Sequence, residues 1–388
     1  MLIKFSLPMQ LLTVLIAVVA LGHLLPIEMV SFFYTISLML KEFLGFMLPF
    51  MVFSFIAAGV LSFKKNTPIV IAILLACVFT SNLLVPLISY FCCSTILHDL
   101  TSNIALSQVS LDNSIHPLYT ISLPRVIAPE HAIFLAIAIG SITSFYKATV
   151  IEDIIATCKQ SIEWIINTVF IPVLPLYVFG FLLEVHARGI FFQLFQSYGK
   201  TYALIIMLQT VLTYFIYLLA SNFNLAKTFQ YIKNAVPSYL TAFSTMSSAA
   251  AIPVTIKCAE KNTKNPALSS IATPILANIH LFGDAITVPV LALVTLFLFK
   301  GIIPAFTTIV TFFVYFSLTM LAASGIPGGG VIVVIPILKS ILGFNDTMVS
   351  LMVTLHLLQD GLGTGTNVMG DGALMIIINN ILKKAHIK

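Results

Sequence analysis

Residues 320–340 read MLAASGIPGGGVIVVIPILKS, an apolar segment interrupted by the run Ser324-Gly-Ile-Pro-Gly-Gly-Gly330. The apolar stretch around it, 302–345, is too long for one membrane span, and glycines with a proline cannot sustain a helix through its middle. A broken helix at membrane depth is tolerated only where it is buried in protein or lines a wet cavity. The run therefore predicts a re-entrant helical hairpin in a membrane protein.

A second interruption lies in residues 227–257, where the polar run Thr241-Ala-Phe-Ser-Thr-Met-Ser-Ser248 is followed by Pro253. Two interrupted segments in one half of a chain, each followed by an apolar helix, are typical of transporters built from inverted repeats. The ends of such half-helices expose N–H and carbonyl groups, which bind an anionic group and a cation respectively. We therefore expect the two hairpins to meet at a solute-binding site.

The composition places the whole chain in a membrane. Of the 388 residues, 59% are hydrophobic and 9% are charged, whereas soluble domains carry roughly 25% charged residues. The mean hydropathy of +1.06 likewise indicates a surface that faces lipid, where apolar runs form helices because a helix satisfies its own backbone. The net charge of +5 comes from basic residues scattered over short connections, a pattern of membrane topology and not of a nucleic-acid surface.

Apolar runs of membrane-spanning length fall at 8–26, 31–62, 67–97, 130–147, 151–186 and 192–222. The polar stretch 99–120 predicts an external loop. The first run predicts a transmembrane helix and not a signal peptide. With the N-terminus inside, most lysines of the connections fall on the inner side. These features predict a multi-pass protein of the cell's inner membrane.

Polar and acidic residues concentrate in the two predicted helices that follow the interrupted segments. Helix 266–297 carries Asn278, His280 and Asp284, and helix 346–382 carries Asp360, Thr364, Asn367 and Asp371. The spacing of the second set places it on one helical face. Two carboxylates on one stripe inside a bilayer predict a functional site. The alternative is a hydrogen-bonded seam between helices.

At these residues the sequence resembles the dicarboxylate/amino-acid:cation symporter family, which includes glutamate and neutral amino-acid transporters. The run Ser247-Ser-Ala-Ala-Ala-Ile-Pro-Val-Thr255 is similar to the tip of that family's first re-entrant hairpin, and Ser324–Gly330 is similar to the tip of the second. Asn367-Val-Met-Gly-Asp371 is similar to the cation-binding stretch of the last helix. The resemblance implies an all-α fold of eight transmembrane helices and two re-entrant hairpins, arranged as inverted repeats and working as an elevator in a homotrimer.

The same resemblance implies a division of the chain. Residues 1–222 would form mainly scaffold and trimerisation helices, although the third helix, 67–97, would join the transport core. Residues 223–388 would form that core, with the hairpins 227–257 and 302–345 and the helices 266–297 and 346–382.

The resemblance also implies contacts for a substrate with α-amino and α-carboxylate groups. Asp360 matches the aspartate that binds the ammonium, and Thr364 and Asn367 match the pair that binds the carboxylate. The matching hairpin contacts are Ser247, Ser248 and the backbone around Gly325 and Ile326. This set is chemically coherent, since a buried carboxylate pairs with an ammonium while amides and helix ends bind a carboxylate.

Four positions depart from the family pattern. The arginine that pairs with an acidic substrate side chain is Gly363, and the threonine near that side chain is Asp284. A sodium-binding aspartate is Phe282, which has no oxygen for a hard cation, and an asparagine is His280. Since glycine cannot supply a guanidinium fork, we expect an amino acid with a neutral or cationic side chain. A glutamate or dicarboxylate symporter with an altered site is the alternative.

The sequence leaves the coupling cation open between sodium and a proton. Thr80 and Ser81 match sodium ligands of the family, and Asn367 and Asp371 would still form one sodium site. His280 would instead carry a proton, because histidine titrates near physiological pH, or would be a neutral hydrogen-bonding residue. No cofactor other than a sodium ion is expected.

Other classes of function fit these residues less well. Broken helices and a polar stripe could line an ion channel, but the polar groups converge on one pocket and not on a ring. The replaced positions also fit a relative that no longer transports. An enzyme is not expected, because the chain has no HExxH or GxSxG motif and Asp360 and Asp371 lie roughly 16 Å apart along one helix.

Overall fold

The computed structural model describes residues 7–62, 68–101, 115–124, 127, 129–146, 149–165, 168–169, 171–189, 191–321, 323 and 328–385. Every regular element in these ranges is a helix, so the all-helical prediction is confirmed for them. The first eight helices are α1 (Leu7–Leu21), α2 (Ile27–Ser62), α3 (Pro68–Thr95), α4 (Leu97–Thr101), α5 (Pro129–Tyr146), α6 (Thr149–Ile165), α7 (Ile171–Ala187) and α8 (Phe191–Ala220). The others are α9 (Leu225–Thr245), α10 (Ser248–Thr263), α11 (Pro266–Ile279), α12 (Phe282–Lys300), α13 (Phe306–Met320), α14 (Gly329–Ser340) and α15 (Asp346–Lys384).

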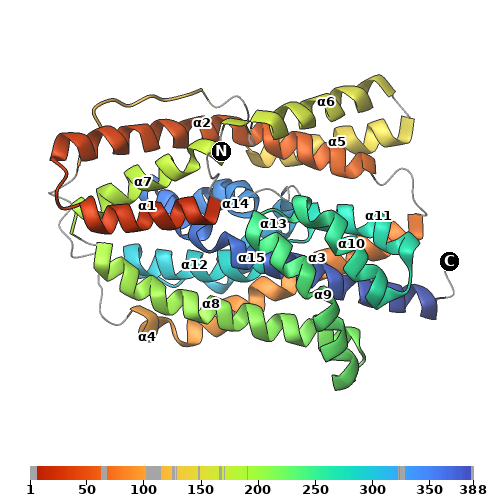
Figure 1. Cartoon of the computed structure of the whole chain (residues 1–388). Helices are drawn as coiled ribbons and strands as arrows, with labels where there is room; N and C mark the ends of the chain where they lie inside the picture. The colour runs from red at the N-terminus through yellow and green to blue at the C-terminus, as the bar shows by residue number, and fades with distance from the viewer. Residues whose placement is uncertain are drawn as a thin grey trace, which may run out of the picture.

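The long helix α2 organises one side of the molecule. It contacts α5, α6 and α7, and α1 packs against α7. Figure 1 shows α2, α5 and α6 as a layer along one edge, opposite α8 and α9. The contact includes a cluster of small and branched side chains, Ala57, Ala132, Ala136 and Ile155. Small residues allow helices in lipid to approach closely.

The centre of the molecule is formed by α12 and α15. The two helices contact each other, α12 also contacts α3 and α8, and α15 also contacts α8, α9, α10 and α11 (Figure 1). Every residue of α12 from Phe282 to Leu296 is buried, and so is every residue of α15 from Gly363 to Ile376. A helix that is buried on all sides lies in a core, so the polar residues of α12 and α15 are enclosed by protein.

Each interrupted segment folds as a pair of contacting helices. Residues 227–257 lie in α9 and α10, which are joined at Met246 and Ser247. Met246 ends α9 in the left-handed region with a φ of 51°, and Ser247 begins α10 as an N-cap whose side chain accepts from the Ala250 N–H at 3.2 Å. Residues 302–345 lie in α13 and α14. The predicted tip at 324–327 lies outside the described residues.

Two predicted helices have the wrong extent. Residues 151–186 form two helices, α6 and α7, and not one span. Residues 266–297 form α11 and α12, which are separated at His280 and Leu281. The predicted helix 346–382 is continuous in α15.

Side chains from distant helices satisfy the backbone groups that the break between α11 and α12 frees. The Ile279 carbonyl accepts from the Asn82 side chain of α3 at 3.0 Å. On the other side of the break, the Gly283 N–H donates to Oδ1 of Asn367 on α15 at 2.6 Å. Helix ends leave backbone groups without intrahelical partners, so these two asparagines stabilise a break that the local sequence does not announce.

Three helical stretches of the described chain are long and apolar enough to cross a membrane: Ala72–Thr95, Gln196–Ala220 and Pro266–Lys300. Four further apolar helices are shorter: Met9–Leu21, Pro172–Ala187, Phe306–Met320 and Gly329–Ser340. Together they indicate an integral multi-pass membrane protein. The count of eight spans, the elevator arrangement and the division of the chain near residue 222 stay predictions.

Candidate functional site

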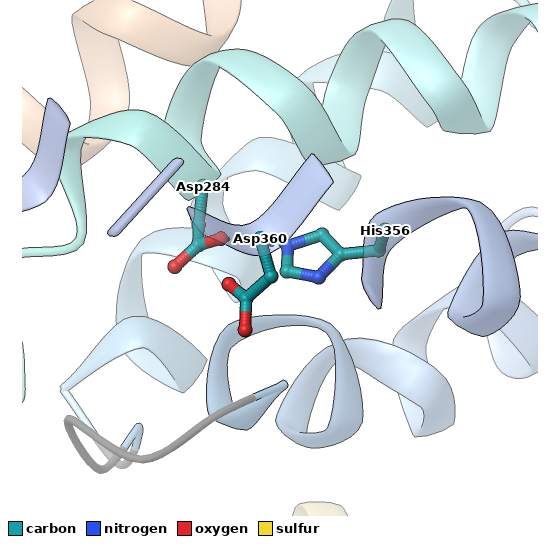
Figure 2. Close-up of side chains that lie close together, drawn as sticks. All are labelled: Asp284, His356 and Asp360. Atoms are coloured by element: carbon teal, nitrogen blue, oxygen red, sulfur yellow. Dashed lines mark hydrogen bonds and ion pairs between the residues drawn. The ribbon is translucent and has the colours of Figure 1, made fainter. Parts of the chain in front are cut away.

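Three titratable side chains meet where α12 begins and α15 passes (Figure 2). Asp284 lies in the first turn of α12, and His356 and Asp360 lie one turn apart on α15. A ligand atom of each residue lies within 4.8 Å of those of the other two. His356 is fully buried, and Asp284 and Asp360 are each 3% exposed. Buried charged groups need partners, so the contacts of this cluster indicate what it can bind.

Both carboxylate oxygens of Asp284 have partners. Oδ1 lies 2.6 Å from Nε2 of His356, and Oδ2 accepts from the side-chain amide of Asn367 at 3.1 Å. The Asn367 oxygen in turn accepts from the N–H groups of Gly283 and Asp284 at the start of α12. On α14, a Cβ added to Gly330 would lie 2.5 Å from Oδ2. The Asp284 carboxylate is therefore enclosed by α12, α14 and α15, and the close approach of α14 requires a glycine.

Asp360 is bonded to neutral donors. Its Oδ2 accepts from the backbone N–H of Gly328 at 2.8 Å, and its Oδ1 accepts from the Thr364 hydroxyl at 3.2 Å. Gly328 has a φ of +71°, and a Cβ there would lie 2.8 Å from Leu357, so this position favours glycine for two reasons. Since neither bonded donor carries a charge, the Asp360 carboxylate retains the capacity to bind an ammonium group.

A second buried pair joins the break between α11 and α12 to α15. Nδ1 of His280 lies 2.8 Å from Oδ1 of Asp371, and Nε2 lies 2.9 Å from the Ser81 hydroxyl of α3. A neutral imidazole satisfies both contacts, because it donates to the carboxylate and accepts from the hydroxyl. Among the described residues, Oδ2 of Asp371 has no hydrogen-bond partner. That oxygen is therefore available to a cation.

The surroundings of the second pair are mostly apolar. Thr80 is exposed, and its hydroxyl donates to the Ala76 carbonyl at 2.8 Å, away from the histidine. Phe282 is 2% exposed and packs closely on α15. A Cβ added at Gly370 would lie 2.5 Å from the Cβ of Phe282. A cavity of about 380 Å³, lined by Thr80, Ser81 and Phe282 together with apolar side chains, lies beside the pair. The aromatic ring of Phe282 offers no ligand to a hard cation.

The predicted residues of α12 and α15 fall into two groups in the structure. Asp284, Asp360, Thr364 and Asn367 surround the start of α12, and His280, Asp371 and Ser81 form the second pair with its hydroxyl. The Asn367 oxygen accepts from α12, whereas Asp371 bonds to His280. The two residues predicted to share a sodium ion thus share no hydrogen-bond partner.

The first hairpin approaches α15 near these groups. Ala242 of α9 and Ala251 of α10 pack against Val368 of α15. Ser248 is 1% exposed, and its hydroxyl has no partner in the part of the chain that the structure describes. Ser247 caps α10. The predicted contacts at Gly325 and Ile326 lie outside the described residues.

Two polar residues of α15 were missed by sequence reasoning. His356 lies four residues before Asp360, and this spacing, which places both on one helical face, could have revealed it. Gln359 is 6% exposed, and neither atom of its amide has a partner among the described residues. It lies beside Gly363, where an added Cβ would be 3.4 Å from the Gln359 Nε2.

A bundle of apolar helices long enough to cross a membrane, with two acid–histidine pairs buried among them, is typical of an integral membrane transporter. Among known proteins, residues 7–381 match the sodium:dicarboxylate symporter family. The chain is 28% identical over 286 residues to the serine/threonine transporter SstT of Acinetobacter baumannii (strain AYE), covering 71% of this chain and 67% of that protein. It is 29% identical over 300 residues to the SstT of Acinetobacter baylyi (strain ATCC 33305 / BD413 / ADP1), covering 74% and 70%.

The chain belongs to the sodium:dicarboxylate symporter family. It is a secondary active transporter, not an enzyme, and it couples a cation to the movement of a small amino acid or related carboxylate. The family prediction from the sequence is confirmed.

Proposed function

We propose that this protein imports a small amino acid with a neutral side chain, with Asp360 binding its ammonium group. The observation that carries the proposal is the buried Asp360 carboxylate, which is bonded only to the neutral donors of Gly328 and Thr364 among the described residues. A substrate ammonium adds to or replaces these bonds, and a charged donor binds a carboxylate roughly twice as strongly as a neutral one.

The substrate carboxylate then lies toward the donors next to Asp360. Thr364 supplies a hydroxyl one turn further along α15. The Ser248 hydroxyl, which no described residue bonds, supplies another from the tip of the first hairpin. Both polar atoms of the Asn367 amide bond to α12: the oxygen accepts from the Gly283 N–H, and the nitrogen donates to Asp284. We therefore assign Asn367 the role of holding Asp284 in place, with any direct contact to the substrate requiring a change in those bonds.

The substrate side chain is neutral because, among the described residues, an acidic or a cationic side chain would find no unpaired opposite charge near Gly363. No cationic side chain occupies position 363, so an acidic side chain has no fork to bind. A cationic side chain would have to compete with His356 for Asp284, which already lies 2.6 Å from the imidazole. The two relatives described above are named serine/threonine transporters, and both of those amino acids have small neutral side chains.

Sodium is the coupling ion that we propose, and its ligand is Oδ2 of Asp371, which has no hydrogen-bond partner among the described residues. A neutral His280 satisfies both of its contacts without an extra proton. The alternative is a proton carried by His280 itself. We further propose a homotrimer in the inner cell membrane that contains the eight spans and works as an elevator, with residues 1–222 mainly as scaffold and 223–388 as transport core.

Counterflow into liposomes loaded with a panel of amino acids tests the substrate. We expect exchange of serine, threonine and alanine and none of aspartate, glutamate or malate. Exchange confined to the acidic compounds would overturn the proposal. The variant Gly363→Arg should lower serine exchange by at least about tenfold, because its side chain enters the space beside Gln359 and Asp284 and pairs with the carboxylate. Gly363→Ala, whose methyl group makes only ordinary contacts there, is the matched control.

The coupling ion is tested separately in proteoliposomes. A sodium gradient at equal pH on both sides should drive serine accumulation, and a pH gradient without sodium should not. Accumulation driven by the pH gradient alone, and lost in His280→Gln, would establish the proton alternative. Cross-linking of the purified protein to a trimer, and no further, would support the proposed assembly.

A further inference from the structure

Gln359 is a buried amide whose hydrogen bonds are not made to the residues that the structure describes. It is 6% exposed, and among the described residues neither Oε1 nor Nε2 has a partner. Buried side-chain amides are nearly always bonded, and one that is not weakens the folded state. A glutamine in this position therefore needs an explanation other than packing.

A second buried glutamine provides the comparison. Gln209 on α8 is 4% exposed, and its Nε2 donates to the Thr287 hydroxyl of α12 at 3.1 Å. The protein thus pairs a buried glutamine when its role is to join two helices. Gln359 lies on α15 beside α12, yet its amide bonds to neither helix.

The unpaired amide faces the proposed substrate site. At Gly363, the three atoms nearest to an added Cβ are Nε2 of Gln359 at 3.4 Å, Oδ1 of Asp284 at 3.8 Å and Oε1 of Gln359 at 3.8 Å. The same Oδ1 is bonded to His356, whose Nδ1 also has no partner in the described chain. Polar atoms with unused capacity therefore border Gly363, a position about one turn from Asp360 that has no side chain.

We infer that Gln359 is the residue that recognises the side chain of the substrate, and that it selects a hydroxyl group. The inference rests on the proposed function and adds to it the chemical class of the side chain. An amide offers one acceptor and two donors, and a hydroxyl offers both a donor and acceptor sites. When an amino acid is bound to Asp360 by its ammonium group, a hydroxyl on its side chain satisfies the Gln359 amide. The methyl group of alanine leaves that amide unpaired.

The physical basis of this selectivity is the penalty for an unpaired buried group. A site built to hydrogen-bond a hydroxyl rejects the analogue that lacks it more strongly than an apolar pocket rejects an extra methyl group. Gln359 therefore gives a preference for serine over alanine and over O-methylserine, which lacks the donor. A Cβ added at Gly363 would lie only 3.4 Å from Nε2 of Gln359, so the space beside the amide favours small hydroxylated side chains.

The wild-type protein in liposomes gives the first test. We expect kcat/KM for serine to exceed that for alanine and for O-methylserine by about tenfold, the effect of one buried hydrogen bond. Equal values for the three compounds would overturn the inference, as expected if the amide is simply hydrated, while leaving neutral amino-acid transport intact. Exchange of none of the three would refute the proposed function itself. Preference for asparagine over serine would replace the hydroxyl by an amide and overturn the stated class.

Variants at the two glutamines give the second test. Gln359→Met keeps the length of the side chain and removes its polar atoms, so the serine-to-alanine ratio should fall about tenfold toward one, while the unfolding temperature in detergent rises. Gln359→Asn draws the amide back by one methylene and should also lower the ratio. Gln209→Met, the matched control, should lower the unfolding temperature and leave the ratio unchanged. A serine-to-alanine ratio equal to that of the wild type in both Gln359 variants would overturn the inference. If neither variant folds, the comparison of substrates in the wild-type protein decides the question.

Discussion

The pairs His280–Asp371 and His356–Asp284 are both buried and both involve α15, but they differ in what stays unbonded. The distances from histidine nitrogen to carboxylate oxygen are 2.8 Å and 2.6 Å. In the first pair both ring nitrogens are bonded, and one carboxylate oxygen has no partner among the described residues. In the second pair both carboxylate oxygens are bonded, and one ring nitrogen has no partner in the same part of the chain. The free group thus differs in kind: an anionic oxygen that suits a cation, and a polar nitrogen near an organic substrate.

The comparison suggests that different parts of α15 bind the cation and the organic substrate. The two α15 members, His356 and Asp371, lie about 22 Å apart at the usual helical rise, although Asn367, which donates to Asp284, lies only one turn from Asp371. Asp360 lies one turn from the second pair and belongs with it. A symporter binds both a solute and a cation, and α15 carries a residue of each proposed site.

The largest effect that we predict is the loss of transport in Asp360→Asn. The amide has the same shape and no charge, so the substrate ammonium loses its counter-charge, and kcat/KM for serine should fall by at least about 100-fold. Radiolabelled uptake at equal amounts of inserted protein measures this. Asp346→Asn, on the exposed first residue of the same helix, is the control and should transport normally. Near-normal uptake by Asp360→Asn would remove the second pair from the substrate site.

Alanine substitution of the two histidines tests the comparison directly. His280→Ala leaves Asp371 buried with no partner among the described residues, which should lower stability by about 3–5 kcal/mol. His356→Ala leaves Asp284 bonded to Asn367, so it should lower stability by only about 1–3 kcal/mol and change the order of substrates. Thermal unfolding in detergent and counterflow give the two readouts. A greater loss of stability in His356→Ala would contradict the assigned difference.

Gly330→Ala should have an intermediate effect that is confined to the second pair. Its Cβ would lie 2.5 Å from the Asp284 carboxylate, and overpacking of this kind costs about 1–3 kcal/mol. We expect a raised KM for serine and a lower unfolding temperature, with sodium dependence unchanged. Gly199→Ala on α8, where an added Cβ meets nothing within 4 Å, is the control. Equal behaviour of the two variants would mean that α14 does not hold Asp284 as the structure has it.

The smallest effect that we predict is that of Lys41→Met. Lys41 on α2 lies 3.4 Å from Asp346 at the start of α15, but the Asp346 side chain is 62% exposed and also pairs with Lys339 at 2.6 Å. Exposed ion pairs contribute at most about 1 kcal/mol and are screened by salt. Unfolding curves at low and high salt should differ slightly in the wild type and less in the variant, which keeps the Lys339–Asp346 pair. A loss comparable to that of His280→Ala would show that this contact, too, is a major support of α15.

Much of this arrangement was predictable because its causes are local in the sequence. Glycine and proline in 324–330, and the polar run before Pro253, indicated the two helix pairs α13–α14 and α9–α10. Carboxylates in an apolar helix indicated Asp360 and Asp371, since such groups are costly in lipid. These signals depend on residue type alone.

The rest depends on contacts between residues far apart in the chain. The break at His280 and Leu281 is stabilised by Asn82 and Asn367, which no window of sequence around it contains. Whether an imidazole on an apolar helix is bonded depends on the helix opposite, so His356 gave no sign of its pairing with Asp284. Gln359 differs from Gln209 in having no hydrogen-bond partner among the described residues, and that difference depends on contacts made only in the folded protein.

The bond from the Gly328 N–H to Asp360 has a consequence for the transport cycle. A substrate ammonium at Asp360 has to share the carboxylate with this N–H or displace it. Because Gly328 is the N-cap of α14, displacement shifts the start of that helix. In the proposed mechanism, occupancy of the amino-group site and the position of α14 are therefore linked.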